Sequence, residues 1–162
     1  MAGGGGLAQQ KVAAPKLPKD LTKLHLRVLS DVRMRRLLPP GALLILAVSG
    51  GQDSLCLAKV MFDVAAAHSW RLHVAHCDHR WRDDSAANAE HVRALATEWG
   101  MPFSLATAEE PLHSEADARE WRYKQLLRIA TEAGAEHVLT GHTASDRAET
   151  LLYNLTRGAA AG

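Results

Sequence analysis

Six consecutive apolar residues, Leu43–Val48, end abruptly at the polar sequence SGGQDS, and this junction constrains the fold more than any other stretch of the chain. Unbroken apolar character is typical of a strand that is covered on both faces, as in the middle of a parallel sheet. After the glycines, apolar residues return with helical spacing from about Ser54 to His68. The junction therefore predicts a central strand, a tight glycine turn and a well-buried helix.

The same alternation of strand and helix patterns continues along the chain. Further strands are expected over 71–77, 102–107 and 136–141. Further helices are expected over 20–37, where Asp20 is the cap, over 85–99, and from Ser114 to Gly134. A last helix is expected from about residue 143, and its apolar face consists of Ala148, Leu151, Leu152 and Leu155. Strands joined through helices favour right-handed crossovers and a parallel sheet. We therefore predict an α/β fold with helices on both faces of a parallel sheet and the strand order 3-2-1-4.

Charge is distributed unevenly, although the net charge of the chain is only +1. Residues 1–40 carry a net charge of +6 and residues 41–162 a net charge of −5. A basic leading segment, which includes Arg27, Arg33, Arg35 and Arg36, is able to meet nucleic acid phosphates. The alternative is a solvated tail and helix face without a partner.

Cysteine count and hydropathy narrow the class of protein. Cys56 and Cys77 are too few for a disulfide framework or a CxxC motif, and no apolar run approaches the roughly 20 residues that span a bilayer. Residues 1–19, which begin MAGGGG, resemble a disordered leader without a clear targeting signal. We expect a domain over 20–162 that is located in the cytoplasm of a bacterium, or otherwise in a plastid or mitochondrion.

The SGGQDS stretch, Ser49–Ser54, has the composition of a phosphate-binding loop. Free backbone N–H groups at a helix start attract anions, and glycines allow close approach of the backbone. The candidate ATP-binding residues here are Ser49, Gly50, Gly51, Gln52, Asp53 and Ser54, with Asp53 also able to hold Mg²⁺. The stretch is neither a Walker A motif nor GxGxxG. A plain glycine turn with an Asp or Ser helix cap is the alternative.

Three other stretches carry groups that bind ligands. DHRWR follows the second strand and brings Asp78, His79 and Arg82 to the same end of the sheet. HTASDRAET follows the fourth strand and brings His142, Asp146, Glu149 and Thr150. With the order 3-2-1-4, Asp146 faces Asp53, and two acids beside a polyphosphate imply Mg²⁺. For Glu149 alone, a favourable place at a helix N-terminus is an alternative.

The third stretch, EADAREWRY, places Arg119 and Arg122 on one face of a helix, together with Tyr123. Neighbouring guanidiniums repel each other unless an anion or an acid lies between them, so a phosphate or carboxylate ligand is indicated. Ion pairing with Glu115, Asp117 or Glu120 is the alternative.

These motifs carry a resemblance to a known family. SGGQDS is similar to the SGGxDS signature of the PP-loop ATP pyrophosphatases, which adenylate an oxygen of their substrate and release pyrophosphate. CDHRWR, SEADAREWRY and GHTASDRAET resemble, in the same order and spacing, elements of the tRNA(Ile)-lysidine synthetases. The resemblance covers about Leu43 to Gly158.

The resemblance implies a ligase that adenylates the wobble cytidine of isoleucine tRNA and joins L-lysine to it, with ATP and Mg²⁺. It implies catalytic roles for Asp53, Asp146, Arg119 and Arg122, ATP contacts from His79 and His142, substrate contacts from Asp78, Arg82, Glu149 and Thr150, and a metal held by Asp53 and Asp146. Asp53 or Asp146 is expected to accept the proton of the lysine ammonium.

The chain departs from the family pattern at its end, where relatives continue past an RG sequence into further elements and tRNA-binding domains. We therefore expect a nucleotide-binding domain that is incomplete at its C-terminal end, with the fourth strand as an uncovered edge through which chains could associate. Two alternatives stay open. One is another PP-loop enzyme such as a tRNA thiolase, although only Cys56 and Cys77 are present to carry sulfur. The other is an ATP-binding fragment without ligase activity.

Overall fold

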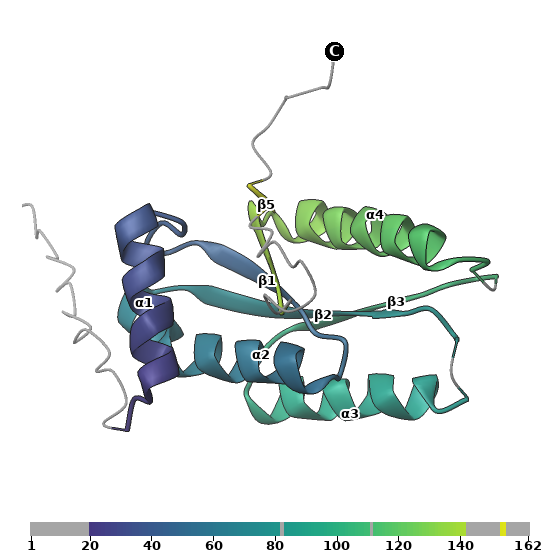
Figure 1. Ribbon diagram of the computed structural model, residues 1–162, viewed down its shortest axis with the longest axis horizontal. Helices are drawn as coiled ribbons and strands as arrows, with labels where there is room; N and C mark the ends of the chain where they lie inside the picture. Colours follow the sequence, from purple (N-terminus) through teal and green to yellow (C-terminus); the bar gives the residue numbers. More distant parts are fainter. Residues whose placement is uncertain (1–19, 82, 111, 142–152, 155–162) are drawn as a thin grey trace, which may run out of the picture.

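A computed structural model describes residues 20–81, 83–110, 112–141 and 153–154 (Figure 1). The expected leader, residues 1–19, lies outside this part. The described chain alternates helices and strands in the order α1 (Lys23–Arg35), β1 (Leu43–Ala47), α2 (Gln52–Ala65), the 3₁₀ turn η1 (Ala66–His68), β2 (Arg71–Asp78), α3 (Ser85–Glu98), β3 (Phe103–Thr107), α4 (Glu115–Ala133), β4 (His137–Thr140) and β5 (Tyr153–Asn154). No helix in these ranges is long and apolar enough to cross a membrane.

The sheet has the order β3-β2-β1-β4-β5, which confirms the predicted order of the first four strands. These four strands are parallel, with Leu44 opposite Leu72 on one side and Ile45 opposite Val138 on the other. Because the four strands are parallel, their carboxyl ends meet at one end of the sheet. β2 and β3 lie on one side of β1 and β4 lies on the other, so the strand order reverses between β1 and β4, and this is the switch point where ligands bind in such sheets.

Helices cover both faces of the sheet, as predicted. Figure 1 shows α2 and α3 below the sheet, α4 above it, and α1 at the end opposite the carboxyl ends of the strands. Leu44 and Leu46 of β1 pack in the core shared with α2 and α3, whereas the intervening Ile45 packs in the core shared with α4. All three side chains are fully buried. An unbroken apolar run was therefore a sound indication of a two-sided strand.

Helix boundaries follow local capping. Thr22, rather than Asp20, caps α1, because the Thr22 hydroxyl accepts a hydrogen bond from the His25 N–H and the His25 ring lies 3.2 Å from the Thr22 nitrogen. Ser114 caps α4 as predicted, accepting from the Asp117 N–H, and Gly134 ends that helix in the left-handed conformation. Both ends of α4 were therefore readable from the sequence.

The region after β4 corrects two expectations. The edge of β4 is not uncovered, because β5 pairs with it in antiparallel fashion, placing Asn154 opposite His137 and Tyr153 opposite Val138. Residues 153–154 were expected inside a helix and instead form a strand, since the ladder satisfies backbone groups of β4 that an edge leaves unpaired. The earlier part of that helix, residues 143–152, lies outside the described residues. Association of chains through an unpaired edge of β4 was expected, but at His137 and Val138 that edge is already paired with β5.

Candidate functional site

The loop between β1 and α2 is held by a network of serine hydroxyls. The Ser54 hydroxyl donates to the carbonyl of Gly51 at 2.9 Å and accepts from the Ser49 N–H at 3.1 Å. The Ser49 hydroxyl lies 3.1 Å from that of Ser54 and accepts weakly from the Gly51 N–H at 3.4 Å. Ser54 is buried. The two serines thus fix the shape of the loop, and the Ser54 hydroxyl proton is used in the hydrogen bond to the Gly51 carbonyl.

The start of α2 has no side-chain cap. Gly51 is the N-cap residue and offers no side-chain oxygen, while Asp53 lies exposed in the first turn. The alternative of an ordinary Asp or Ser cap is therefore not what the structure has. The first-turn N–H groups and the positive end of the helix dipole lack an internal acceptor from a side chain, which is the arrangement that binds phosphate groups.

Gly50 is required at its position for two reasons. Its φ of +86° lies in the region that side-chained residues rarely adopt, and a Cβ atom there would lie 2.0 Å from Oδ1 of Asn88. The Asn88 amide on α3 donates to the carbonyl of Ser49 at 2.9 Å. Asn88 therefore supports the loop from beneath and leaves no room for a side chain at Gly50.

The exit of β4 lies directly against the same loop. A Cβ atom on Gly141 would lie 2.8 Å from the Ser54 Cα and 2.9 Å from the Asp53 carbonyl oxygen, so the two backbones are in contact. The expectation that the loop after the fourth strand begins beside SGGQDS is confirmed up to this residue. The candidates further along it, His142, Asp146, Glu149 and Thr150, lie outside the described residues.

The end of β2 forms a tight turn. Oδ1 of the buried Asp78 accepts from the Arg80 N–H at 2.8 Å, and Arg80 has a left-handed φ of 60°. This contact gives Asp78 a role in shaping the turn that presents His79 and Trp81. Arg82 lies outside the described residues.

The surroundings of His79 favour its neutral form. Burial lowers the pKa of His79 below its ordinary value of 6.5, and the guanidinium of Arg122 lowers it further. Its Nδ1 is buried and has no hydrogen-bond partner in the part of the chain that the structure describes. A neutral imidazole with an unused nitrogen is suited to a hydrogen bond with an uncharged polar ligand group.

A cavity of about 440 Å³ joins the loop to the end of β2. This volume is within the range of small-molecule sites. The lining residues come from the β1–α2 loop, the end of β2 and the start of α3: Ser49, Gly50, Gly51, His76, Cys77, Asp78, His79, Arg80, Trp81, Asp84, Ser85 and Asn88. The structure therefore brings Ser49–Gly51 of the predicted loop and residues 78–81 of the DHRWR stretch to one cavity.

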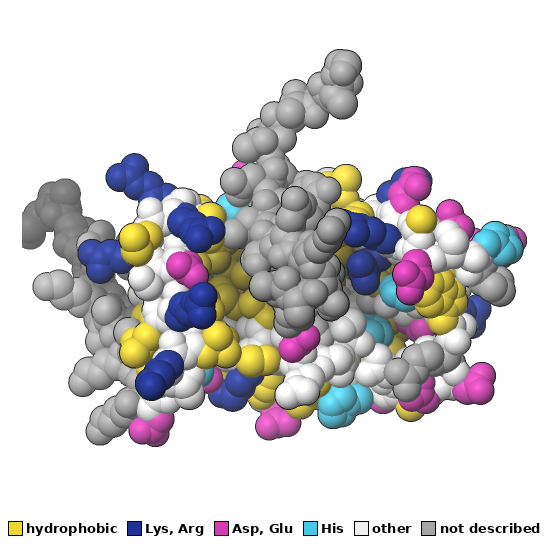
Figure 2. Space-filling view, in the orientation of Figure 1, with side chains coloured by type: hydrophobic (Ala, Val, Ile, Leu, Met, Phe, Trp, Pro, Cys, Tyr) yellow, Lys and Arg dark blue, Asp and Glu magenta, His cyan; other side chains and the backbone are white. Residues whose placement is uncertain are grey.

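Arg119 and Arg122 line a second cavity of about 470 Å³ together with His79 and Trp81. The alternative interpretation was ion pairing of these arginines with Glu115, Asp117 or Glu120, and no such pair occurs among the described residues. Glu120 pairs with Lys124, and Asp117 accepts a hydrogen bond from the Ser114 hydroxyl. Both guanidiniums lie near the Tyr123 ring, at 5.7 and 5.8 Å from its centroid. In Figure 2 basic, acidic, histidine and hydrophobic side chains intermingle at the right, the end to which the strands point.

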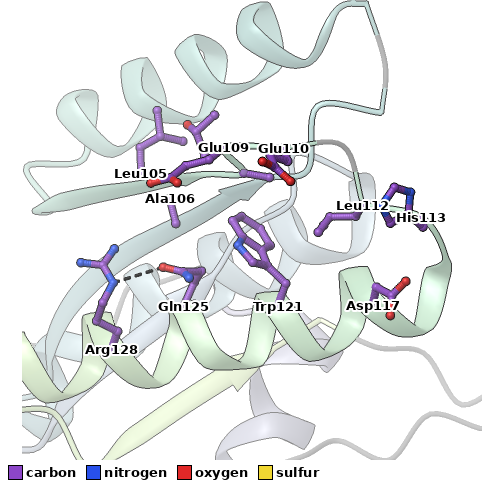
Figure 3. Close-up of a pocket in the computed structure, with 12 residues that line it drawn as sticks. Leu105, Ala106, Glu109, Glu110, Leu112, His113, Asp117, Trp121, Gln125 and Arg128 are labelled. Atoms are coloured by element: carbon purple, nitrogen blue, oxygen red, sulfur yellow. Dashed lines mark hydrogen bonds between the residues drawn. The ribbon is translucent and has the colours of Figure 1, made fainter.

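A third cavity, of about 860 Å³, lies between the end of β3 and α4 (Figure 3). Glu109 and Glu110 from the loop and Asp117 from the helix give it an acidic rim, and the indole of Trp121 points into it. Arg128 at its far end donates to Gln125 at 3.1 Å. The cavity contains none of the candidate site residues that were predicted from the sequence, although Asp117 and Trp121 lie within the SEADAREWRY motif.

Several residues of the site were not predicted. Asn88 reaches the loop from 39 positions further along the chain, and nothing in a helical polar position announces such a contact. His76 is buried in β2 with Nδ1 2.6 Å from the carbonyl of Val48, which fixes the strand end beside the loop. Trp81 and Trp121 stood within recognised motifs, so their aromatic character was the available signal.

The donor set for a divalent cation is partial in the described residues. No group of three or more His, Cys, Asp or Glu side chains that could hold a metal occurs among them. Asp53 offers an exposed carboxylate at the loop, without a hydrogen bond or ion pair to the residues that the structure covers. One carboxylate combined with phosphate oxygens and water fits Mg²⁺, which keeps several waters and binds few protein ligands.

A mostly parallel α/β sheet with an uncapped glycine loop at its switch point is typical of nucleotide-binding proteins. The sequence model of the PP-loop domain family matches residues 27–162, and the chain belongs to this family. Its relatives include a tRNA(Ile)-lysidine synthase from Nostoc sp., 55% identical over 140 residues, and a chloroplastic tRNA(Ile)-lysidine synthase from Staurastrum punctulatum, 40% identical over 149 residues.

The matches cover most of this chain but less than half of each relative. The Nostoc alignment covers 86% of this chain and 41% of the relative, and the Staurastrum alignment covers 92% and 30%. Among solved structures, the U34-tRNA thiolase NcsA from Methanococcus maripaludis with its [4Fe-4S] cluster is similar over 76% of this chain and 45% of its own, with a TM-score of 0.65 and 16% identity. That likeness confirms the fold.

Proposed function

We propose that this chain is the ATP-binding and activating part of a tRNA(Ile)-lysidine synthase. The observation that carries the proposal is the loop at the start of α2, where Gly50 adopts φ +86° and Gly51 leaves the helix without a side-chain cap. The resemblance of the flanking motifs and the curated relatives support the choice of reaction. The substrates are then ATP, the wobble cytidine of isoleucine tRNA and L-lysine.

ATP occupies the 440 Å³ cavity with its polyphosphate on the loop. The N–H groups at the start of α2 face the phosphate oxygens, where negative charge increases as pyrophosphate leaves. Asp53, together with Asp146, holds Mg²⁺, whose charge offsets that of the polyphosphate. The neutral His79 contributes a hydrogen bond to the nucleotide, and His142 is assigned to the same site.

The reaction has two displacements. The C2 oxygen of cytidine attacks the α-phosphorus, so that a P–O bond forms while the bond to the β-phosphate bridging oxygen breaks and pyrophosphate leaves. The lysine amine then attacks C2, forming the C–N bond while the C–O bond breaks and AMP departs with the oxygen. The ammonium proton passes to a carboxylate, either Asp53 or Asp146. Arg119 and Arg122 stabilise anionic substrate groups, and Asp78, Arg82, Glu149 and Thr150 position the substrates.

An exchange assay tests this function. Radiolabelled pyrophosphate should enter ATP when the chain is mixed with ATP, Mg²⁺ and unmodified isoleucine tRNA, and the exchange should disappear with a tRNA whose wobble base is uridine. Lysine consumption is measured in parallel with ornithine as the control amine. Binding of ATP with no pyrophosphate exchange under any of these conditions would instead support a nucleotide-binding module without ligase activity.

Affinity for tRNA is expected to be low. Concentrated positive charge lies in residues 1–40, of which the exposed Arg27 and Arg33 on α1 belong to the described part, and the rest of the chain is net negative. Such binding weakens steeply with salt. A clear preference for isoleucine tRNA at about 150 mM salt would contradict this expectation. One curated relative is chloroplastic, so a plastid is among the compartments we propose, beside a bacterial cytoplasm or a mitochondrion.

A further inference from the structure

Trp81 is an exposed tryptophan whose position is fixed. The residue retains 47% of its accessible surface, although burial of an indole is favourable. Its Nε1–H donates to the carbonyl of Leu112 at 3.1 Å, across 31 positions of the chain. The hydrogen bond ties the β2 turn to the loop before α4 and leaves much of the indole uncovered. An anchored and uncovered aromatic face is an arrangement that accepts another flat group.

One ring contacts Trp81 directly, and a second ring contacts the first. The His79 ring meets Trp81 edge to face at a centroid distance of 5.8 Å, and it meets Trp121 in the same manner at 5.7 Å. His79 is thus wedged between two indoles, and the three rings form a rigid aromatic cluster. The hydrogen bond and the ring contact restrict the orientation of Trp81 before a ligand binds, which lowers the entropic cost of binding.

The exposed indole shares its cavity with the guanidiniums of Arg119 and Arg122. Arg122 is half-buried and Arg119 exposed, and neither forms an ion pair with a described carboxylate, although Glu115 lies in the same cavity lining. An aromatic face beside unpaired guanidiniums matches one nucleotide of a single-stranded nucleic acid, which supplies a flat base and an adjacent phosphate.

This cavity adjoins the one assigned to ATP. His79 and Trp81 line both cavities, so a base lying on Trp81 would be separated from the nucleotide at the loop by no more than these side chains. The glycine loop belongs to the first cavity alone and the two arginines to the second alone. This division favours a second nucleotide, rather than the adenine of ATP, as the occupant of the cavity with the arginines.

We propose that Trp81 is the stacking platform for a base extruded from single-stranded RNA, and that Arg119 and Arg122 hold the phosphate next to that base. The inference rests on the proposed function, because it gives the RNA base that is to be activated a place beside ATP. It assigns to Trp81 a positioning role that the loop chemistry does not require.

The test compares two heptanucleotide RNAs, one with a central cytidine and one with an abasic site at that position. Both are labelled, and their dissociation constants are measured by fluorescence anisotropy with the intact chain in the presence of ATP and Mg²⁺. Trp81→Ala should weaken binding of the cytidine RNA about tenfold and leave the abasic RNA nearly unchanged. Trp81→Phe, which keeps a ring but lacks the N–H, should recover most of the loss.

Arginine variants separate the phosphate contact from the base contact. Arg122→Ala should weaken both RNAs alike, since it removes a phosphate contact. Arg128→Ala is the matched control on the same helix, because Arg128 is exposed and paired with Glu132 at 2.9 Å. It should affect neither RNA. Circular dichroism melts verify that each variant is folded. If Trp81→Ala is not folded, the affinities of Trp81→Phe for the two RNAs are compared with those of the parent chain instead.

Three results would overturn the inference: equal weakening of both RNAs by Trp81→Ala, no preference of the parent chain for the cytidine RNA, or a larger loss of affinity for ATP than for RNA. The last would assign Trp81 to the adenine of ATP. Failure of the proposed function is distinguishable. If the parent binds RNA through Trp81 but shows no pyrophosphate exchange, the stacking site stands and the ligase assignment falls. If pyrophosphate exchange occurs and Trp81→Ala leaves RNA binding unchanged, the ligase assignment stands and the stacking site falls.

Discussion

Replacement of Gly50 by alanine tests the loop with a single added methyl group. The new Cβ would lie 2.0 Å from Oδ1 of Asn88 and 2.8 Å from its Cγ and Nδ2, and the backbone would have to keep a φ of +86°. Asn88 must then swing away and give up its hydrogen bond to Ser49. The substitution therefore strains the loop and removes the support beneath it.

The expected magnitude follows from these two effects. A non-glycine residue at positive φ costs about 1–2 kcal/mol, and loss of the Asn88 hydrogen bond costs about 0.5–1.5 kcal/mol. Gly50→Ala should thus lower the free energy of unfolding by about 1.5–3.5 kcal/mol, which corresponds to roughly 3–14 °C in Tm for a domain of this size. If the loop relaxes instead, the strain appears as weaker ATP binding, and we expect at least about a tenfold rise in the ATP Kd.

Gly41→Ala is the matched control for backbone strain. Gly41 has a similar φ of +76°, but no heavy atom lies within 4 Å of an added Cβ. It should lose about 1–2 kcal/mol of stability and bind ATP like the parent. Thermal melts and calorimetric titration with ATP measure both quantities. The reasoning is refuted if Gly50→Ala matches Gly41→Ala in both, or if adding Asn88→Ala to Gly50→Ala restores none of the lost stability.

Further predictions concern single ionisable groups. Asp53→Asn should weaken ATP binding far more with Mg²⁺ than without it, and equal loss in both titrations would argue against a metal ligand. Burial raises the pKa of the Cys77 thiol to about 11, so at pH 8 only about one Cys77 in a thousand is a thiolate. A thiol reagent should modify the exposed Cys56 first, and equally fast labelling of both cysteines would contradict this. Burial lowers the pKa of His137, whose unfolded form takes up a proton near pH 6.5, so stability should fall as the pH drops below that value. In thermal melts His137→Gln should reduce the difference between pH 7.5 and pH 5.5, and an unchanged difference would exclude this residue as its source.

The architecture was predictable because the apolar patterns are strong and each element ends at a recognisable signal. Leu44, Ile45 and Leu46 are all fully buried, which only a strand covered on both faces permits. The start of α1 was misplaced by two residues, since Asp20 and Thr22 are both acceptable caps and only the fold decides between them. Residues 153–154 form a strand because pairing with β4 outweighs local helical periodicity.

The site was predictable where its residues adjoin in sequence and unpredictable where they meet through space. SGGQDS displays its glycines and hydroxyls in one stretch, so its chemistry is visible in the chain. Asn88 acts on that loop from another helix, and its contact depends on how α3 packs below the sheet. The fixed orientation of Trp81 likewise depends on a carbonyl at Leu112. Side-chain type was visible in these cases, whereas the partner was not.

The contact of Gly141 with the backbone of Asp53 and Ser54 has a consequence for synthesis of the protein on the ribosome. The β1–α2 loop leaves the exit tunnel early, yet Gly141, which packs against it, is synthesised nearly ninety residues later. β1 likewise gains β2 soon after it emerges but waits for β4 to cover its other edge. Contacts so distant in sequence form late because closing the intervening chain carries an entropic penalty. A nascent chain therefore acquires its finished nucleotide loop only after the fourth strand has emerged, and shorter intermediates expose an edge of the central strand that chaperones would have to shield.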